Sequence, residues 1–177
     1  IPDESLLPLL QAEFALRQRD FYQGLALLAQ QAVLLKDPAL ARRALRLAEF
    51  VNDTDQAAMM AVRLVELDPD DGAAAAAASG WLSRAGRAVD AVYYAMLAFE
   101  RGYPVNVATN LGTYDTLDEV SQERIAEAIL AIVAQWPEDD QAAIAASLLA
   151  RLEGNFKGAE NLILPVLERS PEDTRAV

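Results

Sequence analysis

The sequence predicts an all-α fold in which short helices stack in pairs. Two features of composition point this way: about 35 of the 177 residues are alanine, and aromatic residues make up only 7% of the chain. Alanine loses no side-chain entropy in a helix and offers a strand little to pack, so such a chain favours helix over sheet. A third feature is a regular spacing of prolines. Five of them follow apolar stretches at intervals of 31 to 35 residues: Pro38, Pro69, Pro104, Pro137 and Pro171. A proline ends one helix and suits the start of the next.

A turn motif recurs between these prolines. Its clearest copies run over residues 86–91 and 154–159, and weaker copies begin at Asn52 and Arg19. The glycine or asparagine supplies the left-handed backbone conformation that ends a helix. Five positions later each copy has a small residue, which lets two helices of a pair approach closely. These small residues are Gly24, Ala57, Ala91 and Ala159.

The two spacings divide the chain into five helix–turn–helix units. We expect them over residues 4–36, 38–69, 72–103, 104–136 and 137–170. The fourth is irregular, because Gly112–Leu117 breaks its first helix early, and Thr116 or Ser121 is expected to cap its second helix. Pro165 is expected to kink the last helix unless its partner carbonyl faces solvent. The residues after Pro171 look like the opening turn of another helix, so we expect residues 1–177 to be one array within a longer chain.

This pattern resembles the tetratricopeptide repeat (TPR) family. The period near 34 residues, the turn over Gly86–Ala91 and the run Leu64–Pro69 are typical of it. The resemblance implies a right-handed superhelical α-solenoid whose concave groove, lined by the first helix of each unit, binds a protein or peptide. By the family's register, the groove positions with candidate binding roles are Arg42, Arg46, Glu49, Ala73, Ala76, Gly80, Ser83, Asn106, Thr109 and Asn110.

These positions also have plainer interpretations. Arg42, Arg43 and Arg46 can form a solvated face that balances nearby acids, although Arg42 and Arg46, four residues apart, can also grip a carboxylate. The run Ala73–Ala78 can be a tightly packed helix, and Trp81 and Trp136 are expected to pack between helices. The sequence leaves open whether the groove or the convex face binds.

Several function classes are disfavoured. The chain contains no cysteine and no histidine, so the commonest catalytic base and zinc ligands are missing, and we expect no enzyme activity, cofactor or metal. The acidic runs Asp68–Asp71 and Glu138–Asp140 lack the spacing of a calcium loop and suit helix starts. The net charge of −12 argues against a nucleic-acid partner. The apolar stretches are too short to span a membrane.

A narrower resemblance concerns the stretches Leu10–Phe21 and Asp37–Glu49, which look like the first repeats of bacterial TPR lipoproteins. It implies a periplasmic adaptor, held at the outer membrane by a lipid anchor upstream, that binds a carboxy-terminal processing protease and its substrates. A cytoplasmic location is the alternative. Other functions left open are an assembly or secretion factor of an envelope or polysaccharide export complex, and a regulatory domain fused to an enzyme.

Overall fold

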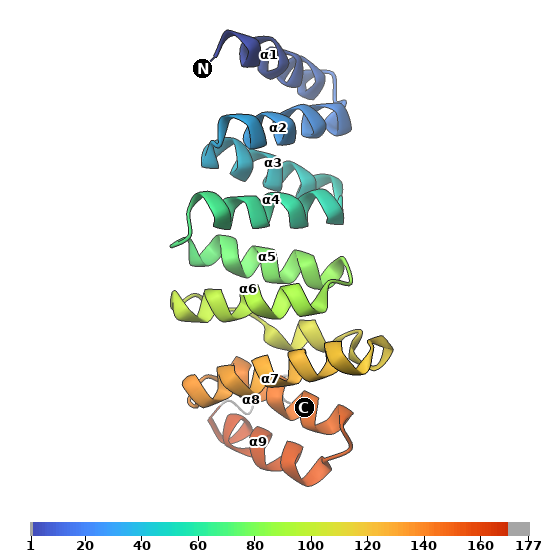
Figure 1. Ribbon diagram of the computed structural model, residues 1–177, viewed down its shortest axis with the longest axis vertical. Coiled ribbons are helices and arrows are strands. Elements are labelled where there is room, and N and C mark those ends of the chain that lie inside the picture. Colours follow the sequence, from blue (N-terminus) through green and yellow to red (C-terminus); the bar gives the residue numbers. More distant parts are fainter. Residues whose placement is uncertain (1, 170–177) are drawn as a thin grey trace.

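A computed structural model of the chain describes residues 2–169 and confirms the all-α prediction. Within residues 2–169, nine α-helices and two short 3₁₀ helices lie one after another in a single stack, with α1 at one end and α9 at the other (Figure 1). Four regular hairpins pair α1 (Asp3–Arg17) with α2 (Phe21–Leu35), α3 (Pro38–Val51) with α4 (Thr54–Leu67), α5 (Gly72–Arg84) with α6 (Ala88–Glu100), and α8 (Asp140–Leu152) with α9 (Phe156–Arg169).

The fourth unit is irregular, as predicted. Its first half consists of the 3₁₀ helices η1 (Val107–Leu111) and η2 (Tyr114–Thr116), followed by α7 (Glu119–Gln135). The predicted caps are wrong. Asp118 caps α7, accepting a hydrogen bond from the Ser121 backbone N–H at 2.9 Å, while the Thr116 hydroxyl donates to the Thr113 carbonyl within η2. A carboxylate is the stronger acceptor for the free N–H groups of a helix start.

The four predicted turns all contain a residue in the left-handed conformation. The φ angles are +63° at Arg19, +56° at Asn52, +74° at Gly86 and +78° at Gly154. The small residues five positions later are all buried. At Gly24 a Cβ atom would lie 2.6 Å from Leu16 Cδ2, so this position allows α1 and α2 to approach closely.

The main core is a continuous cluster that runs along the stack from Ala12 to Leu149, and a small second cluster contains Ile144 and Val166. Alanine supplies most of its fully buried positions, which is why the helices can lie close together. Trp136 packs on Phe99 with ring centroids 5.2 Å apart, so it joins neighbouring units, as predicted. The helix α9 runs through Pro165, which is exposed and does not end it.

Two further sequence expectations concern membrane spans and the segment after Pro171. The described helices include none that is both long and apolar enough to cross a bilayer. The further helix expected after Pro171 lies outside the described residues and stays a prediction.

Candidate functional site

The first helices of successive units lie side by side, joined by polar contacts. Arg43 on α3 forms an ion pair with Glu13 on α1. Arg42, also on α3, binds Asp71 at the start of α5 with 2.6 Å between Nη2 and Oδ2. These contacts hold α1, α3 and α5 together as one surface. We call this surface, with η1 and α8 included, the first-helix face.

The same face continues from α5 to η1. The Ser83 hydroxyl donates to the Thr109 carbonyl at 2.7 Å. A second contact between α5 and η1 is buried: Asn110 Nδ2 lies 3.5 Å from Ser79 Oγ, which makes a long and therefore weak hydrogen bond. The irregular fourth unit is thus anchored to α5 although it has no complete first helix.

A hollow of about 500 Å³ lies between α5 and η1, and we call it the α5–η1 hollow. It is lined by Ala76, Gly80, Ser83, Arg84, Pro104, Val105, Asn106 and Thr109. The structure therefore brings together five residues that the sequence placed in the groove. Space at its centre comes from Gly80, where a Cβ atom would meet nothing within 4 Å.

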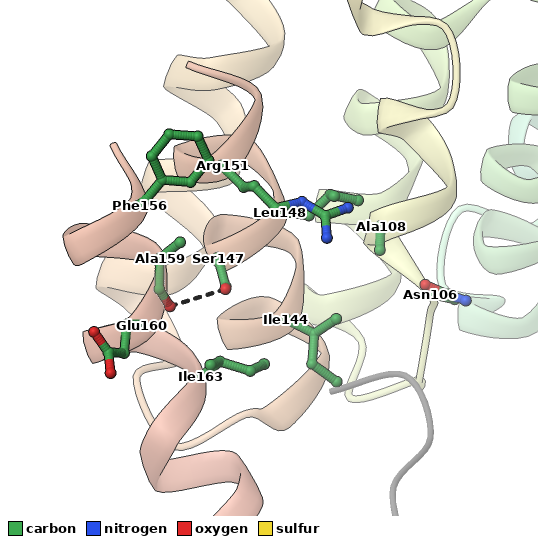
Figure 2. Close-up of a pocket in the computed structure, with 10 residues that line it drawn as sticks. All are labelled: Asn106, Ala108, Ile144, Ser147, Leu148, Arg151, Phe156, Ala159, Glu160 and Ile163. Carbon is green, nitrogen blue, oxygen red and sulfur yellow. Dashed lines mark hydrogen bonds between the residues drawn. The ribbon is translucent and has the colours of Figure 1, made fainter. Parts of the chain in front are cut away.

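A second hollow of about 410 Å³, the α8–α9 hollow, was not predicted. Its walls are mainly apolar and include Ile144, Leu148, Phe156 and Ile163, with Glu160 among the polar lining residues. Asn106, which precedes η1, and Ala108 of η1 lie on the other side (Figure 2). Arg151 extends from α8 towards η1 (Figure 2). Because Asn106 lines both hollows, they flank η1 on the same face.

A signal for the second hollow was present in the sequence. Ile144, Leu148 and Arg151 lie 68 residues after Ala76, Gly80 and Ser83, which is two repeat lengths. Carrying the predicted groove register into the fifth unit would have selected them.

Not every predicted groove residue is available to a partner. Asn110 is 1% exposed, which corrects its assignment to the groove surface: the 3₁₀ geometry of η1 turns it into the core, where its Oδ1 has no hydrogen-bond partner. Glu49 is exposed but accepts a hydrogen bond from Trp81 Nε1 at 3.0 Å. Arg42 is engaged by Asp71, whereas Arg46 and Ala73 are exposed, and Arg46 has no ion-pair partner within residues 2–169.

The charge of the first-helix face contrasts with that of the whole chain. Arg46, Arg84 and Arg151 are exposed on it without an ion-pair partner in the described part of the chain. The Arg84 guanidinium lies 4.7 Å from the centroid of the Trp81 ring, which holds it over the face. Unpaired cations on one surface of a chain with net charge −12 make that surface locally attractive to anions.

Asp71, an acid on the same face, is committed to structure. Burial favours its neutral form, but the hydrogen bond from the Ala74 N–H and the Arg42 guanidinium outweigh it, so the pKa of the carboxyl lies below its ordinary value. Asp71 therefore stays ionised and neutralises Arg42 rather than the exposed arginines.

A further hollow of about 560 Å³ lies on the side of the second helices, between α4 and α6. Met59, Tyr93 and Val33 line it, but the charged residues around it are paired with each other, Arg63 with Glu66 and Arg87 with Asp90. No group of three or more potential ligands among residues 2–169 is placed to hold a metal ion.

Comparison with known proteins finds no matching protein-family profile and no matching curated protein. Solved structures do match. One is YrrB, described as a TPR protein with an unusual peptide-binding site: 14% of residues are identical, the TM-score is 0.52, and the match covers 97% of this chain and 89% of YrrB. The chain has the TPR fold.

A second TPR-like match is MamA, residues 41 to the end, from Desulfovibrio magneticus RS-1. It shares 17% identity with a TM-score of 0.51, and the match covers 97% of this chain and 98% of that one. At such identities the likeness shows the fold and not the binding residues. The predicted solenoid of helical repeats is confirmed, and the binding roles stay predictions.

Proposed function

We propose that the chain is a non-catalytic scaffold whose first-helix face binds an extended, acidic segment of another protein. The observation that carries the proposal is the coincidence of two features: three exposed arginines without acidic partners among the described residues, and two hollows that flank η1 on the same face. YrrB, a TPR protein with an unusual peptide-binding site, supports peptide binding by this fold in general.

The two hollows have different chemistry and would take different side chains. The α5–η1 hollow has small residues at Ala76 and Gly80 and the Arg84 guanidinium on its wall, which suits an acidic side chain. The α8–α9 hollow is walled by Ile144, Leu148 and Ile163 and suits an apolar one. A segment that alternates acidic and apolar residues would satisfy both.

Peptide titrations test this proposal. A labelled peptide of alternating Glu and Leu should bind, and a matched peptide of alternating Lys and Leu should bind at least about tenfold more weakly. Replacing Arg46 and Arg84 together by Glu should weaken binding of the Glu peptide by about tenfold or more, and added salt should weaken it further. The matched control is Arg124→Glu on α7, which changes the charge away from this face.

Two results would contradict the proposal: equal affinity for both peptides, or unchanged affinity in the Arg46→Glu/Arg84→Glu variant. We choose Arg84 rather than Arg42 for the pair of substitutions because Arg42 is already bound to Asp71.

The finer form of the proposal is a bacterial periplasmic adaptor that binds a carboxy-terminal processing protease and presents its substrates. It is supported by the resemblance of Leu10–Phe21 and Asp37–Glu49 to the first repeats of such lipoproteins. Size-exclusion chromatography of the chain mixed with a purified protease of that class tests it. Failure to form a complex would contradict the protease as a partner. Peptide binding by the first-helix face would be unaffected, because the peptide titrations test it separately.

A further inference from the structure

The first helix exposes an apolar surface that nothing in the described chain covers. On α1, Leu6 is 51% exposed, Leu7 63%, Leu10 48% and Phe14 59%. The internal first helices α3 and α5 each pack against a helix on either side, whereas α1 packs mainly on α2. The helix α1 therefore lies at the end of the stack (Figure 1), and its exposed apolar side chains have no second neighbouring helix among residues 2–169 to cover them.

These side chains form one stripe with a charge at each end. Asp3, Leu6, Leu10, Phe14 and Arg17 follow each other at intervals of three or four residues, so they lie on one face of the helix. Asp3 and Arg17 are both exposed, and neither has an ion-pair partner within residues 2–169. The stripe is acidic at its start, apolar in the middle and basic at its end.

We propose that this stripe pairs with the same stripe of a second copy of the chain, antiparallel, about a two-fold axis at Leu10. In that arrangement Leu10 meets its own copy, Leu6 meets Phe14 and Asp3 meets Arg17. The spacing supports it because Asp3 and Arg17, like Leu6 and Phe14, are equally far from Leu10 along α1. A parallel pair would instead set Asp3 against Asp3 and Arg17 against Arg17.

The contact is isologous: the Leu6–Phe14 and Asp3–Arg17 pairs each occur twice, the Leu10–Leu10 contact lies on the axis, and the assembly closes as a dimer. The three apolar side chains of the stripe in each copy make a small interface, at the low end of the sizes found in specific complexes, so we expect a dissociation constant on the order of 10 to 100 µM. The pairing involves α1 and not the hollows that flank η1, so it is independent of the proposed peptide binding.

Sedimentation equilibrium of the 177-residue chain tests the proposal. The expected result is a monomer–dimer equilibrium that Leu10→Lys weakens by at least about tenfold, since each dimer would then contain two facing lysines. Leu130→Lys is the matched control, because Leu130 is a 58% exposed leucine on α7. A chain that stays monomeric to about 500 µM, well above the expected dissociation constant, overturns the proposal. So does a dimer that Leu10→Lys leaves unchanged.

A charge exchange tests the antiparallel register. Asp3→Arg and Arg17→Asp should each weaken the dimer several-fold, and the double variant should recover most of the loss because it restores two opposite-charge pairs. Helix content measured by circular dichroism must be the same in all variants, since both substitutions also act on the helix dipole. The antiparallel pairing is overturned if the two single variants weaken the dimer and the double variant, with the same helix content, does not recover it.

Discussion

Trp81 Nε1 donates a hydrogen bond to Glu49 Oε1 at 3.0 Å, joining α5 to α3, while its ring lies beneath the guanidinium of Arg84. The one indole thus binds an acid and orients a base on the first-helix face. The indole N–H occupies Glu49 Oε1, whereas the Arg84 guanidinium has no hydrogen-bond partner among residues 2–169 and keeps its N–H groups for a ligand. Trp81 therefore places an acid and an unpaired base side by side on this face.

The Trp81–Glu49 contact should contribute measurably to stability. We expect Trp81→Phe to lower the free energy of unfolding by about 1 to 2 kcal/mol, through the lost hydrogen bond and lost packing area. In a double-mutant cycle with Glu49→Gln, measured by urea unfolding, the coupling energy should be about 0.5 to 1 kcal/mol because the pair is exposed. Strictly additive effects of the two substitutions would show that the hydrogen bond contributes nothing.

The same substitution at two glycines of α5 should have opposite effects. Gly80→Ala should raise the free energy of unfolding by about 0.5 to 1 kcal/mol, because alanine is the better helix former and its Cβ would meet no atom. Gly72→Ala should lower it by about 1 to 3 kcal/mol, because the Cβ would lie 2.8 Å from Tyr103 Cβ and 3.0 Å from Arg101 Cβ. Thermal unfolding measures both, and equal signs would contradict the packing around Gly72. Gly80→Ala should also weaken peptide binding by narrowing the α5–η1 hollow.

The features that the sequence predicted correctly depend on local chemistry. A left-handed residue and a small residue five positions later are properties of a single turn, and they hold at Arg19 and Gly24 as well as in the clearer copies. The period of these turns then sets the number and order of the hairpins. For the same reason, the five residues around the α5–η1 hollow could be selected from their register alone.

The features that the sequence did not predict depend on where the irregular fourth unit lies. The register of a regular helix placed Asn110 on the surface, but η1 has three residues per turn and rotates its side chain inward. The α8–α9 hollow was missed because apolar residues such as Ile144 and Leu148 are expected in a core. Only the position of η1 beside α8 makes them line a hollow.

The left-handed turns predict a pair of stability changes of opposite sign. Gly86→Ala should lower the free energy of unfolding by about 1 kcal/mol, since φ is +74° there and the added Cβ would touch nothing, so the cost is that of the backbone alone. Arg19→Gly should raise it by about 0.5 to 1 kcal/mol, because a non-glycine residue is held at +63°. Urea unfolding checks both. A loss of stability in Arg19→Gly would mean that its side chain contributes more than the left-handed backbone costs.

Asp71 predicts a pH dependence of stability. Its folded pKa lies below the ordinary value, despite burial, because the Ala74 N–H and Arg42 stabilise the carboxylate. In the interval between the folded and unfolded pKa values the unfolded chain binds more protons, so stability rises with pH there. The contribution of Asp71 is therefore complete above the unfolded pKa of about 4 and is lost as pH falls through the lower folded pKa. Urea unfolding from neutral to acid pH should show this loss.

Two substitutions at the same position separate the parts of this effect. Asp71→Asn keeps an oxygen that can accept from the Ala74 N–H but loses the charge, so at pH 7 it should cost no more than about 0.5 to 1 kcal/mol and make the acid-side fall in stability shallower. Asp71→Ala loses the helix cap as well and should cost about 1 kcal/mol more. In Asp71→Asn the substitution Arg42→Gln should have little further effect, because the ion pair is already gone. If Asp71→Asn leaves the pH profile unchanged, the carboxylate is not the group whose protonation destabilises the start of α5.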